Sequence, residues 1–177
     1  MDILRPTGFM QYRRIKKLYK RAFPSCERKP FSIIKKMTKA GKSDIWYFSD
    51  GSGFAGLTAT INGSDTILID YLAVEESRRG QGLGSKMIEL LLEQYKGKGV
   101  FLEIERPDEN AENNAERLRR REFYLRAGLV PMNTYAKLFG VDMELLGVNC
   151  QLDFDAYRDF YLNNYGRFAY DHIERIE

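Results

Sequence analysis

The sequence predicts an α/β domain with a mixed sheet, and three observations lead to that prediction. Strand-like apolar stretches at residues 44–49, 54–61 and 66–74 follow one another across short turns, which indicates antiparallel hairpins. Helical and strand-like segments then alternate over residues 83–148, an order typical of α/β proteins. The chain has 177 residues, 44% of them hydrophobic and 30% charged, which is enough to bury one core.

The N-terminal part is expected to form a short strand near residues 3–4 and then two helices. Apolar residues recur at helical spacing over residues 9–23, and Pro24 ends that run. A second, shorter helix is expected over residues 31–40, with Gly41 as its cap.

The hairpin strands lead into residues 66–74, "TILIDYLAV", which are apolar nearly throughout and therefore predict a central strand buried on both faces. Further elements are expected in order as a helix that begins after a glycine loop and ends near Gly97, a strand over 100–105, a helix over 114–127, strands over 133–139 and 141–148, and a helical tail over 153–173.

The charge distribution is uneven, because residues 1–42 hold 13 of the 28 Lys and Arg residues against Asp2 and Glu27. This basic region either favours nucleic acid, an anionic cofactor or an acidic partner, or consists of solvated helix faces. No apolar run is long enough to span a membrane, and the N-terminus has no apolar signal-peptide core. We therefore expect a cytoplasmic protein without a membrane partner.

Few residues in the chain are suited to disulfides or metals. Cys26 and Cys150 are too few for a disulfide framework, so free thiols in a reducing compartment are expected. His172 is the only histidine, which makes a metal site or a histidine-based triad an unfavoured interpretation. We predict no metal cofactor.

The stretch "VEESRRGQGLGSKMI" over residues 74–88 places Gly80, Gly82 and Gly84 at the beginning of an amphipathic helix. Amides at a helix N-terminus lack partners within the helix, and glycines let an anion approach them closely. The loop therefore predicts a phosphate or pyrophosphate site, the alternative being a turn that binds nothing. It does not match a Walker A loop, because Ser85 precedes Lys86, nor the dinucleotide fingerprint, whose sixth position is Ser85 here.

Residues 79–84, "RGQGLG", do fit the pattern [QR]-x-x-G-x-[GA] at every position, behind the strand "YLAV" and ahead of "SKMIELLLEQY". This resembles the pyrophosphate loop of the GNAT superfamily of acyl-CoA-dependent N-acyltransferases. Downstream, "EFYLRAGLVPM" is similar to that family's second motif. The resemblance implies a mixed, mostly antiparallel twisted sheet with a V-shaped splay between two central strands, flanked by helices. It covers residues 1–148, and we expect 149–177 to be a C-terminal helical extension packed on the same domain.

The resemblance also implies a site for acetyl-CoA. In the family, backbone of the strand before the loop binds the pantetheine arm, loop amides hold the pyrophosphate, and a helix tyrosine lies near the thioester sulfur. The cofactor-binding positions here would be Leu72, Ala73, Val74, Arg79, Gly80, Gln81, Gly82, Leu83, Gly84 and Ser85. Tyr124 matches the tyrosine and suits a general acid, the alternative being an ordinary half-buried tyrosine. Arg117 stands where many members have an asparagine.

N-acetyl transfer needs a base, because an alkyl ammonium with a pKa of about 10 must lose a proton before it attacks. Glu103 and Glu105 point to the same face of one strand, and neighbouring carboxylates raise each other's pKa. Glu103 is our first candidate base, Glu105 the second and Asp70 the third. The pair could instead face solvent or hold the substrate's cation.

The function predicted from the sequence is transfer of an acetyl group from acetyl-CoA to a primary amine by direct attack in a ternary complex. The acceptor would be a small-molecule or peptide amine that the sequence does not identify, and a homodimer stays open. An acyl-CoA-binding sensor without turnover is the main alternative. A basic-surfaced nucleic-acid-binding protein is the less favoured one.

Overall fold

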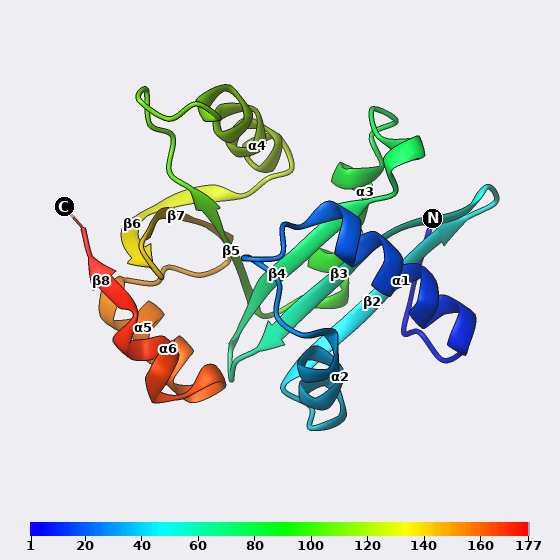
Figure 1. Cartoon of the computed structure of the whole chain (residues 1–177), viewed down its shortest axis with the longest axis horizontal. Coiled ribbons are helices and arrows are strands. Elements are labelled where there is room, and N and C mark those ends of the chain that lie inside the picture. The colour runs from blue at the N-terminus through cyan, green and yellow to red at the C-terminus, as the bar shows by residue number, and fades with distance from the viewer. Residues whose placement is uncertain (177) are drawn as a thin grey trace. The chain divides into compact units, whose positions relative to one another are not determined.

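The computed structural model describes residues 1–176 of the chain (Figure 1). These residues divide into two compact units, the first made of Met1–Asn62 and Ile69–Lys96, and the second of Gly63–Leu68 and the chain from Gly97 onward. In hydrogen-bonded order the strands run β1-β2-β3-β4-β5-β7-β6-β8. The predicted mixed, mostly antiparallel sheet with flanking helices is confirmed, with β4 and β5 as its parallel pair.

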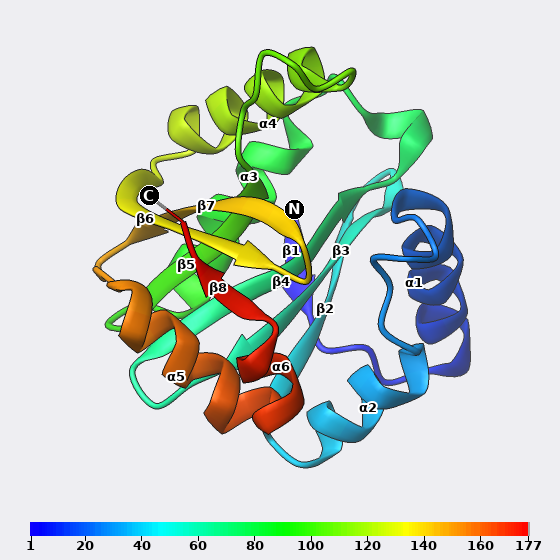
Figure 2. The same ribbon diagram turned by 60° about the vertical axis from the view of Figure 1, so that its left-hand side comes forward.

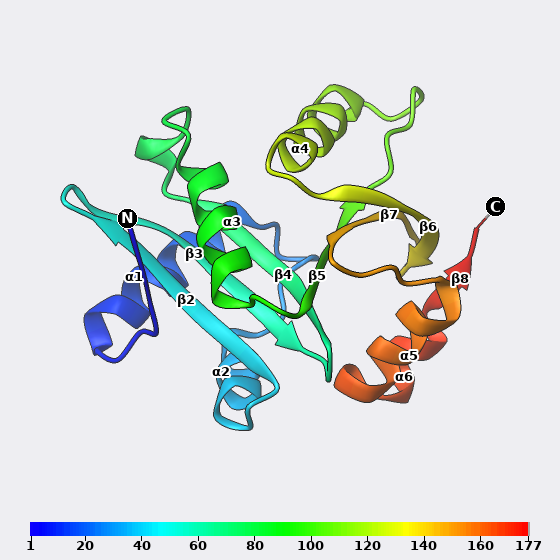
Figure 3. The ribbon, with the colours of Figure 1, turned by 180° about the vertical axis from the view of Figure 1, so that it is seen from behind.

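The first unit holds the N-terminal helices, the hairpin strands and the glycine loop. Its elements are β1 (Asp2–Leu4), α1 (Phe9–Ala22), α2 (Phe31–Lys39), β2 (Ser43–Asp50), β3 (Gly53–Asn62), the later part of β4 (Thr66–Val74), the 3-10 helix η1 (Glu76–Arg78) and α3 (Leu83–Gln94). The helices α1 and α2 cover one face of its strands (Figure 1), and α3 covers the opposite face (Figure 3).

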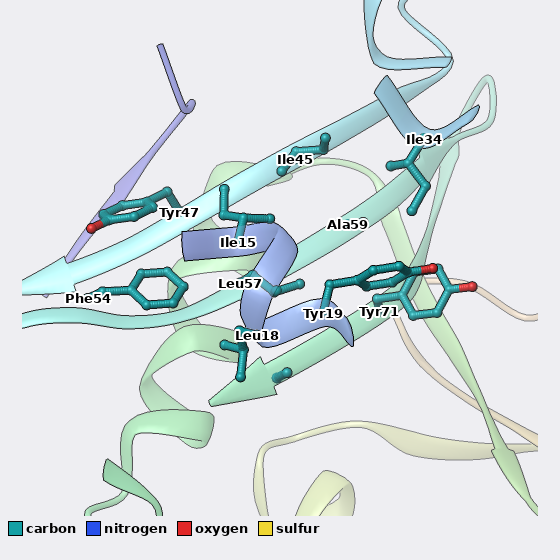
Figure 4. Close-up of a cluster of buried hydrophobic side chains, with 11 residues drawn as sticks. Ile15, Leu18, Tyr19, Ile34, Ile45, Tyr47, Phe54, Leu57, Ala59 and Tyr71 are labelled. Carbon is teal, nitrogen blue, oxygen red and sulfur yellow. The ribbon is translucent and has the colours of Figure 1, made fainter. Parts of the chain in front are cut away.

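The core of this unit lies under α1, and Figure 4 shows how its side chains interdigitate. Ile15, Leu18 and Tyr19 recur at helical spacing on α1 and are buried, as the periodicity of the sequence predicts. They pack against alternate residues of the strands, including Leu57 of β3 and Tyr71 of β4. This packing fixes the first unit's segment of β4 against α1.

The second unit consists of the beginning of β4 together with β5 (Gly99–Glu105), α4 (Asn114–Arg126), β6 (Val130–Leu138), β7 (Val141–Val148), α5 (Phe154–Tyr165), α6 (Arg167–Asp171) and β8 (Ile173–Arg175). The first residues of β4 pair in parallel with β5 from Thr66–Gly99 to Leu68–Phe101. Antiparallel pairs join β5 to β7, β7 to β6 and β6 to β8. Figure 2 shows β8 beside β6, following α5 and α6.

The tail differs from the continuous helix expected over residues 153–173. Gly166, with a φ of 84°, separates α5 from α6 because this left-handed backbone breaks the helical path. The strand β8 follows α6 and extends the sheet at Ala136–Leu138. The domain boundary expected at residue 148 stays a prediction. So does the splay between β4 and β5, because the two strands continue in different units beyond Leu68.

The central strand β4 departs partly from the burial that its sequence predicts. Ile67, Leu68 and Ile69 are buried in succession, but beyond them burial alternates. Tyr71 and Ala73 point into the core under α1, whereas Leu72 and Val74 are half-buried. The strand is therefore fully enclosed at its beginning and accessible along one side at its end, where the candidate cofactor residues lie.

Candidate acetyl-CoA site and catalytic residues

The helix α3 begins without any side-chain cap. Its N-cap is Gly82, and its first turn contains no acidic residue. The first hydrogen bond within the helix runs from the Lys86 amide to the Gly82 carbonyl at 3.3 Å. The amides of Leu83, Gly84 and Ser85 precede it, so the helix itself gives them no partner. Together with the helix dipole, these donors favour an anion at this end.

The glycines shape the approach to these amides. Gly80 and Gly82 have φ values of 77° and 73°, which side-chain-bearing residues rarely adopt. A Cβ atom built at either position would meet no protein atom within 4 Å. Both glycines are therefore required by the backbone conformation, while the space beside them is open to a ligand. This agrees with the use that the sequence predicts for the loop.

The loop is anchored by side chains that come before it. Arg78 of η1 makes two hydrogen bonds to the Asp50 carboxylate, at 2.7 and 3.0 Å, where β2 ends. Hydrogen bonds from Arg78 lower the pKa of Asp50, so the pair stays charged at neutral pH. The Glu75 amide donates to the Ala55 carbonyl at 2.8 Å. These contacts hold the loop to the β2–β3 hairpin without using its own amides.

The strand β4 and the helix α3 approach each other closely at Gly56. A Cβ atom at this position would lie 2.5 Å from the Ala73 carbonyl oxygen and 2.8 Å from the Met87 side chain. Only glycine therefore lets Ala73, one of the expected pantetheine-binding residues, come so near to α3. Within the first unit, the end of β4 thus lies close to α3, the helix that follows the loop at residues 79–85.

Asp70, the third candidate base, is engaged elsewhere in the first unit. Its two carboxylate oxygens accept hydrogen bonds from the Lys29 ammonium at 2.7 and 2.8 Å. The Asp70 side chain is only 9% exposed. Both carboxylate oxygens of Asp70 are thus engaged with Lys29, and its role as a base stays a prediction.

In the second unit, Glu103 of β5 is held by a tyrosine of α5. The Tyr161 hydroxyl donates to the Glu103 carboxylate, with 2.7 and 3.0 Å to its two oxygens. One hydroxyl of α5 therefore holds both oxygens of the Glu103 carboxylate. Burial, and next the charge of Glu103, raise the pKa of the neighbouring Tyr157 well above 10.0.

Glu105 has different partners, although it lies on the same strand. Its carboxylate pairs with Arg117 at 2.8 Å and with Arg120 at 3.5 Å, and Asn113 donates to it at 3.4 Å. Arg117, which stands where the family resemblance implies an asparagine, therefore links the beginning of α4 to the end of β5 through this ion pair. The expectation that Glu103 and Glu105 act as a mutually coupled pair stays a prediction, but each has its own hydrogen-bond donor.

Tyr124 is half-buried on α4, beside Phe123, with ring centroids 4.9 Å apart. Burial raises the pKa of its hydroxyl above the ordinary value of 10.0, and the Arg120 charge partly opposes that shift. The phenol is therefore protonated at neutral pH and could donate a proton. The helix is fixed to β7 by Arg121, which makes hydrogen bonds of 2.8 and 3.0 Å to the buried Glu144.

Sequence reasoning missed Tyr161 and the Arg121–Glu144 pair. Tyr161 lies 58 residues from Glu103, in the tail outside the resemblance, and no local pattern connects the two. Among residues 1–176, no helix combines the length and apolar character that a membrane span needs. Over the same residues, no three His, Cys, Asp or Glu side chains gather in a group that could hold a metal ion.

Comparison with known proteins adds to this geometry. Residues 12–126 match the model of the Acetyltransferase (GNAT) family. A protein of Bacillus subtilis (strain 168) named "Putative acetyltransferase YjbC" is 36% identical over 104 residues. That match covers 59% of this chain and 50% of YjbC, so the chain spans about half the length of this relative.

Solved structures share the fold at lower identity. A "Putative acetyltransferase from GNAT family" from Bacteroides thetaiotaomicron has a TM-score of 0.80 at 21% identity, covering 94% of this chain and 99% of its own. The spermidine N-acetyltransferase of Vibrio cholerae, in complex with CoA and spermine, has a TM-score of 0.65 at 14% identity, covering 83% of this chain and 94% of its own. A Bacillus subtilis acetyltransferase in complex with CoA has a TM-score of 0.60 at 15% identity, covering 84% and 97%.

Proposed function

The chain belongs to the GNAT family of acetyltransferases, and on that premise we propose that it transfers an acetyl group from acetyl-CoA to a primary amine. The acyl group passes by direct attack of the amine on the thioester in a ternary complex. The observation that carries this proposal is the uncapped beginning of α3. Its first amides have no partner within the helix, and two positive-φ glycines leave space for an anion beside them.

In this proposal, residues of the first unit bind the cofactor. The amides from Gly80 to Ser85 hold the pyrophosphate of CoA, and the backbone of Leu72, Ala73 and Val74 binds the pantetheine arm. Arg79, also expected in this site, donates its own amide to the Glu76 carbonyl at 3.3 Å. Two structural features support this assignment. The end of β4 has an accessible side, and Gly56 allows Ala73 to lie close to α3.

In the same proposal, residues of the second unit transfer the protons. Glu103 takes a proton from the substrate ammonium, directly or through water, so that a neutral amine can attack the thioester carbonyl. Tyr161 positions Glu103 through its hydrogen bonds to both carboxylate oxygens. As the C–S bond breaks, the Tyr124 hydroxyl gives its proton to the departing thiolate of CoA, and the proton that the nitrogen loses as the amide forms restores that hydroxyl, directly or through water. Glu105 holds α4 through Arg117, which makes it a positioning residue in this scheme.

One experiment separates this function from a sensor that binds acyl-CoA without turnover. Thermal unfolding with and without CoA reports binding, because a ligand that binds the folded state raises the melting temperature. Release of free CoA thiol from acetyl-CoA, measured with a panel of amines, reports transfer. We expect a positive result in both assays. A thermal shift without amine-dependent thiol release would favour the sensor, and no shift near millimolar CoA would contradict the cofactor site.

A further inference from the structure

A basic pocket of about 350 Å³ opens in the first unit, between the end of α1 and the beginning of α2. Four cationic side chains line it, those of Lys16, Lys20, Arg28 and Lys29, and no acidic residue does. Lys16 and Lys20 are one helical turn apart on the exposed side of α1. The strongly basic N-terminal region thus includes a concave cationic surface.

Three of these four charges are not neutralised by the protein. The Lys29 ammonium pairs with Asp70 at 2.7 Å. Over residues 1–176, no ion pair involves Lys16, Lys20 or Arg28. The Nε atom of Arg28 is buried and has no hydrogen-bond partner among these residues. A buried donor without a partner is unfavourable, and an arginine accommodates an oxyanion through several parallel donors.

The beginning of α2 adds donors to the same pocket. Pro30 is its N-cap and provides no side-chain cap, and the first turn contains no acidic residue. The first hydrogen bond to the Pro30 carbonyl comes from the Ile33 amide at 2.8 Å. The amides of Phe31 and Ser32, both of which line the pocket, precede it. The first residues of α2 and the four cationic residues therefore line the same pocket.

The pocket is joined to the strand that the proposed function assigns to pantetheine. The Tyr71 hydroxyl accepts a hydrogen bond from the Lys29 amide at 3.2 Å and donates one to the Glu27 carbonyl at 2.9 Å. These bonds, with the Asp70–Lys29 pair, fix the segment that carries Arg28 to β4. From Asp70 to Ala73 the strand advances about 10 Å, at roughly 3.3 Å per residue. The pocket is thus within reach of an acceptor whose amine lies near Ala73.

We propose that this pocket binds an anionic group, a carboxylate or a phosphate, that the amine acceptor carries. This inference rests on the proposed function, because that function makes the ligand an amine acceptor. The cationic lining of the pocket is what indicates that the acceptor carries a negative charge. A polycation, such as the spermine in the Vibrio cholerae complex, would be repelled by the same side chains. The acceptor class is therefore an amine with an acidic group, set apart from polyamines.

The first test measures anion binding without turnover. Inorganic phosphate is titrated into the protein at fixed ionic strength, and the Arg28 Nε–H resonance, identified by its loss in Arg28→Lys, is followed by NMR. We expect a saturable shift of this resonance. Lys20→Glu should weaken the affinity for phosphate by about 10-fold. Lys17→Glu, on the same helix but outside the pocket lining, should change that affinity less than about twofold, because salt screens distant charges. No shift, or equal losses in both variants, would overturn the pocket.

The second test measures acceptor choice. The acceptors are chosen to span the roughly 10 Å between Asp70 and Ala73. Acetyl-CoA turnover is compared for 8-aminooctanoate and its amide, for 8-aminooctyl phosphate and 8-aminooctanol, and for spermidine. We expect the acidic member of at least one pair to have a kcat/KM about 10-fold or more above its neutral partner, with spermidine the poorest, and Lys20→Glu to narrow that gap. The two pairs distinguish a carboxylate from a phosphate. Equal rates within both pairs, or a preference for spermidine, would overturn the proposal.

A third arm tells this inference from its alternatives. Saturating CoA should leave the phosphate response of Arg28 intact. Loss of that response would assign the pocket to a phosphate of the cofactor and overturn the acceptor role. A phosphate response together with no transfer to any amine would refute the proposed enzyme function, and with it the acceptor role, while the anion pocket would stand as a separate finding.

Discussion

The helices α3 and α5 are both 12 residues long, yet they begin in opposite ways. The helix α5 is capped by Asp153, whose carboxylate accepts the Ala156 amide at 2.8 Å, and Asp155 adds a negative charge to its first turn. The helix α3 begins at a glycine in left-handed conformation and has neither a capping side chain nor an acidic residue in its first turn.

The difference shows which helix end the chain satisfies by itself. A capping side chain contributes about 1 kcal/mol to helix stability, and α3 lacks that contribution. Its donors and its positive dipole end stay available to an anion, whereas an anion at α5 would meet two aspartates. A bare helix beginning, flanked by glycines whose Cβ positions are open, is thus the feature on which the proposed cofactor site at α3 rests.

The largest expected effect comes from placing a carboxylate at the bare end. Gly82→Asp adds a negative charge and a side chain beside the open amides, so we expect the CoA-induced rise in melting temperature to disappear. Gly41→Asp is a matched control, because Gly41 has a φ of 74° against 73° for Gly82, and a Cβ atom at either meets nothing within 4 Å. Its CoA response should survive. Loss of the response in both variants, or in neither, would contradict the assignment.

The next effect concerns α5, which contacts the candidate base Glu103 through the side chain of Tyr161 and not through the helix end. Glu103→Gln keeps the shape but removes the base, so kcat should fall about 10²-fold or more at neutral pH, and the loss should shrink at high pH. Tyr161→Phe should lower kcat less, because the Glu103 carboxylate stays in place and loses only the hydroxyl that orients it. Glu174→Gln, exposed on β8, is the control. An unchanged pH profile in Glu103→Gln would reassign the base.

Tyr124 should affect the rate and spare binding, since α3 and β4 would provide the cofactor contacts. Tyr124→Phe should lower kcat by roughly 10-fold or more, and an acyl donor with a more acidic thiol should recover part of the loss. Because burial raises the pKa of this phenol above 10.0, the wild-type rate should lose its proton donor only above that pH. Weaker CoA binding with an unchanged kcat would instead make Tyr124 a packing residue.

A smaller effect is expected when α3 is made to resemble α5. Ser85→Asp places a carboxylate in the first turn of α3, where it interacts favourably with the helix dipole by about 0.3–1 kcal/mol. The unliganded protein should therefore melt at a slightly higher temperature, while the affinity for CoA should fall by about 10-fold through repulsion of the pyrophosphate. Ser85→Asn, which lacks the charge, separates the two causes. A Ser85→Asp protein with unchanged affinity would remove the pyrophosphate from this end.

The features that the sequence predicted best are local ones. The glycine loop, the helix behind it and the hairpin strands follow from spacings within about ten residues, and the structure has them where they were expected. The partners of the carboxylates were not predictable in this way. Glu103 and Glu105 are two residues apart, but one is bound by α5 and the other by α4, because the docking of distant helices on β5 decides each partner. The tail, outside the family resemblance, gave no signal of this.

The smallest expected effect lies at α5, where removing the cap tests the other half of the comparison. Asp153→Ala takes away the acceptor of the Ala156 amide, so the free energy of unfolding should fall by about 1 kcal/mol. CoA affinity should not change, because this end makes its bond within the chain and Asp155 still opposes an anion there. Chemical denaturation with and without CoA measures both quantities. If Asp153→Ala weakened CoA binding as strongly as Ser85→Asp, helix-end charge would not be what locates the cofactor, and the contrast between the two helices would fail.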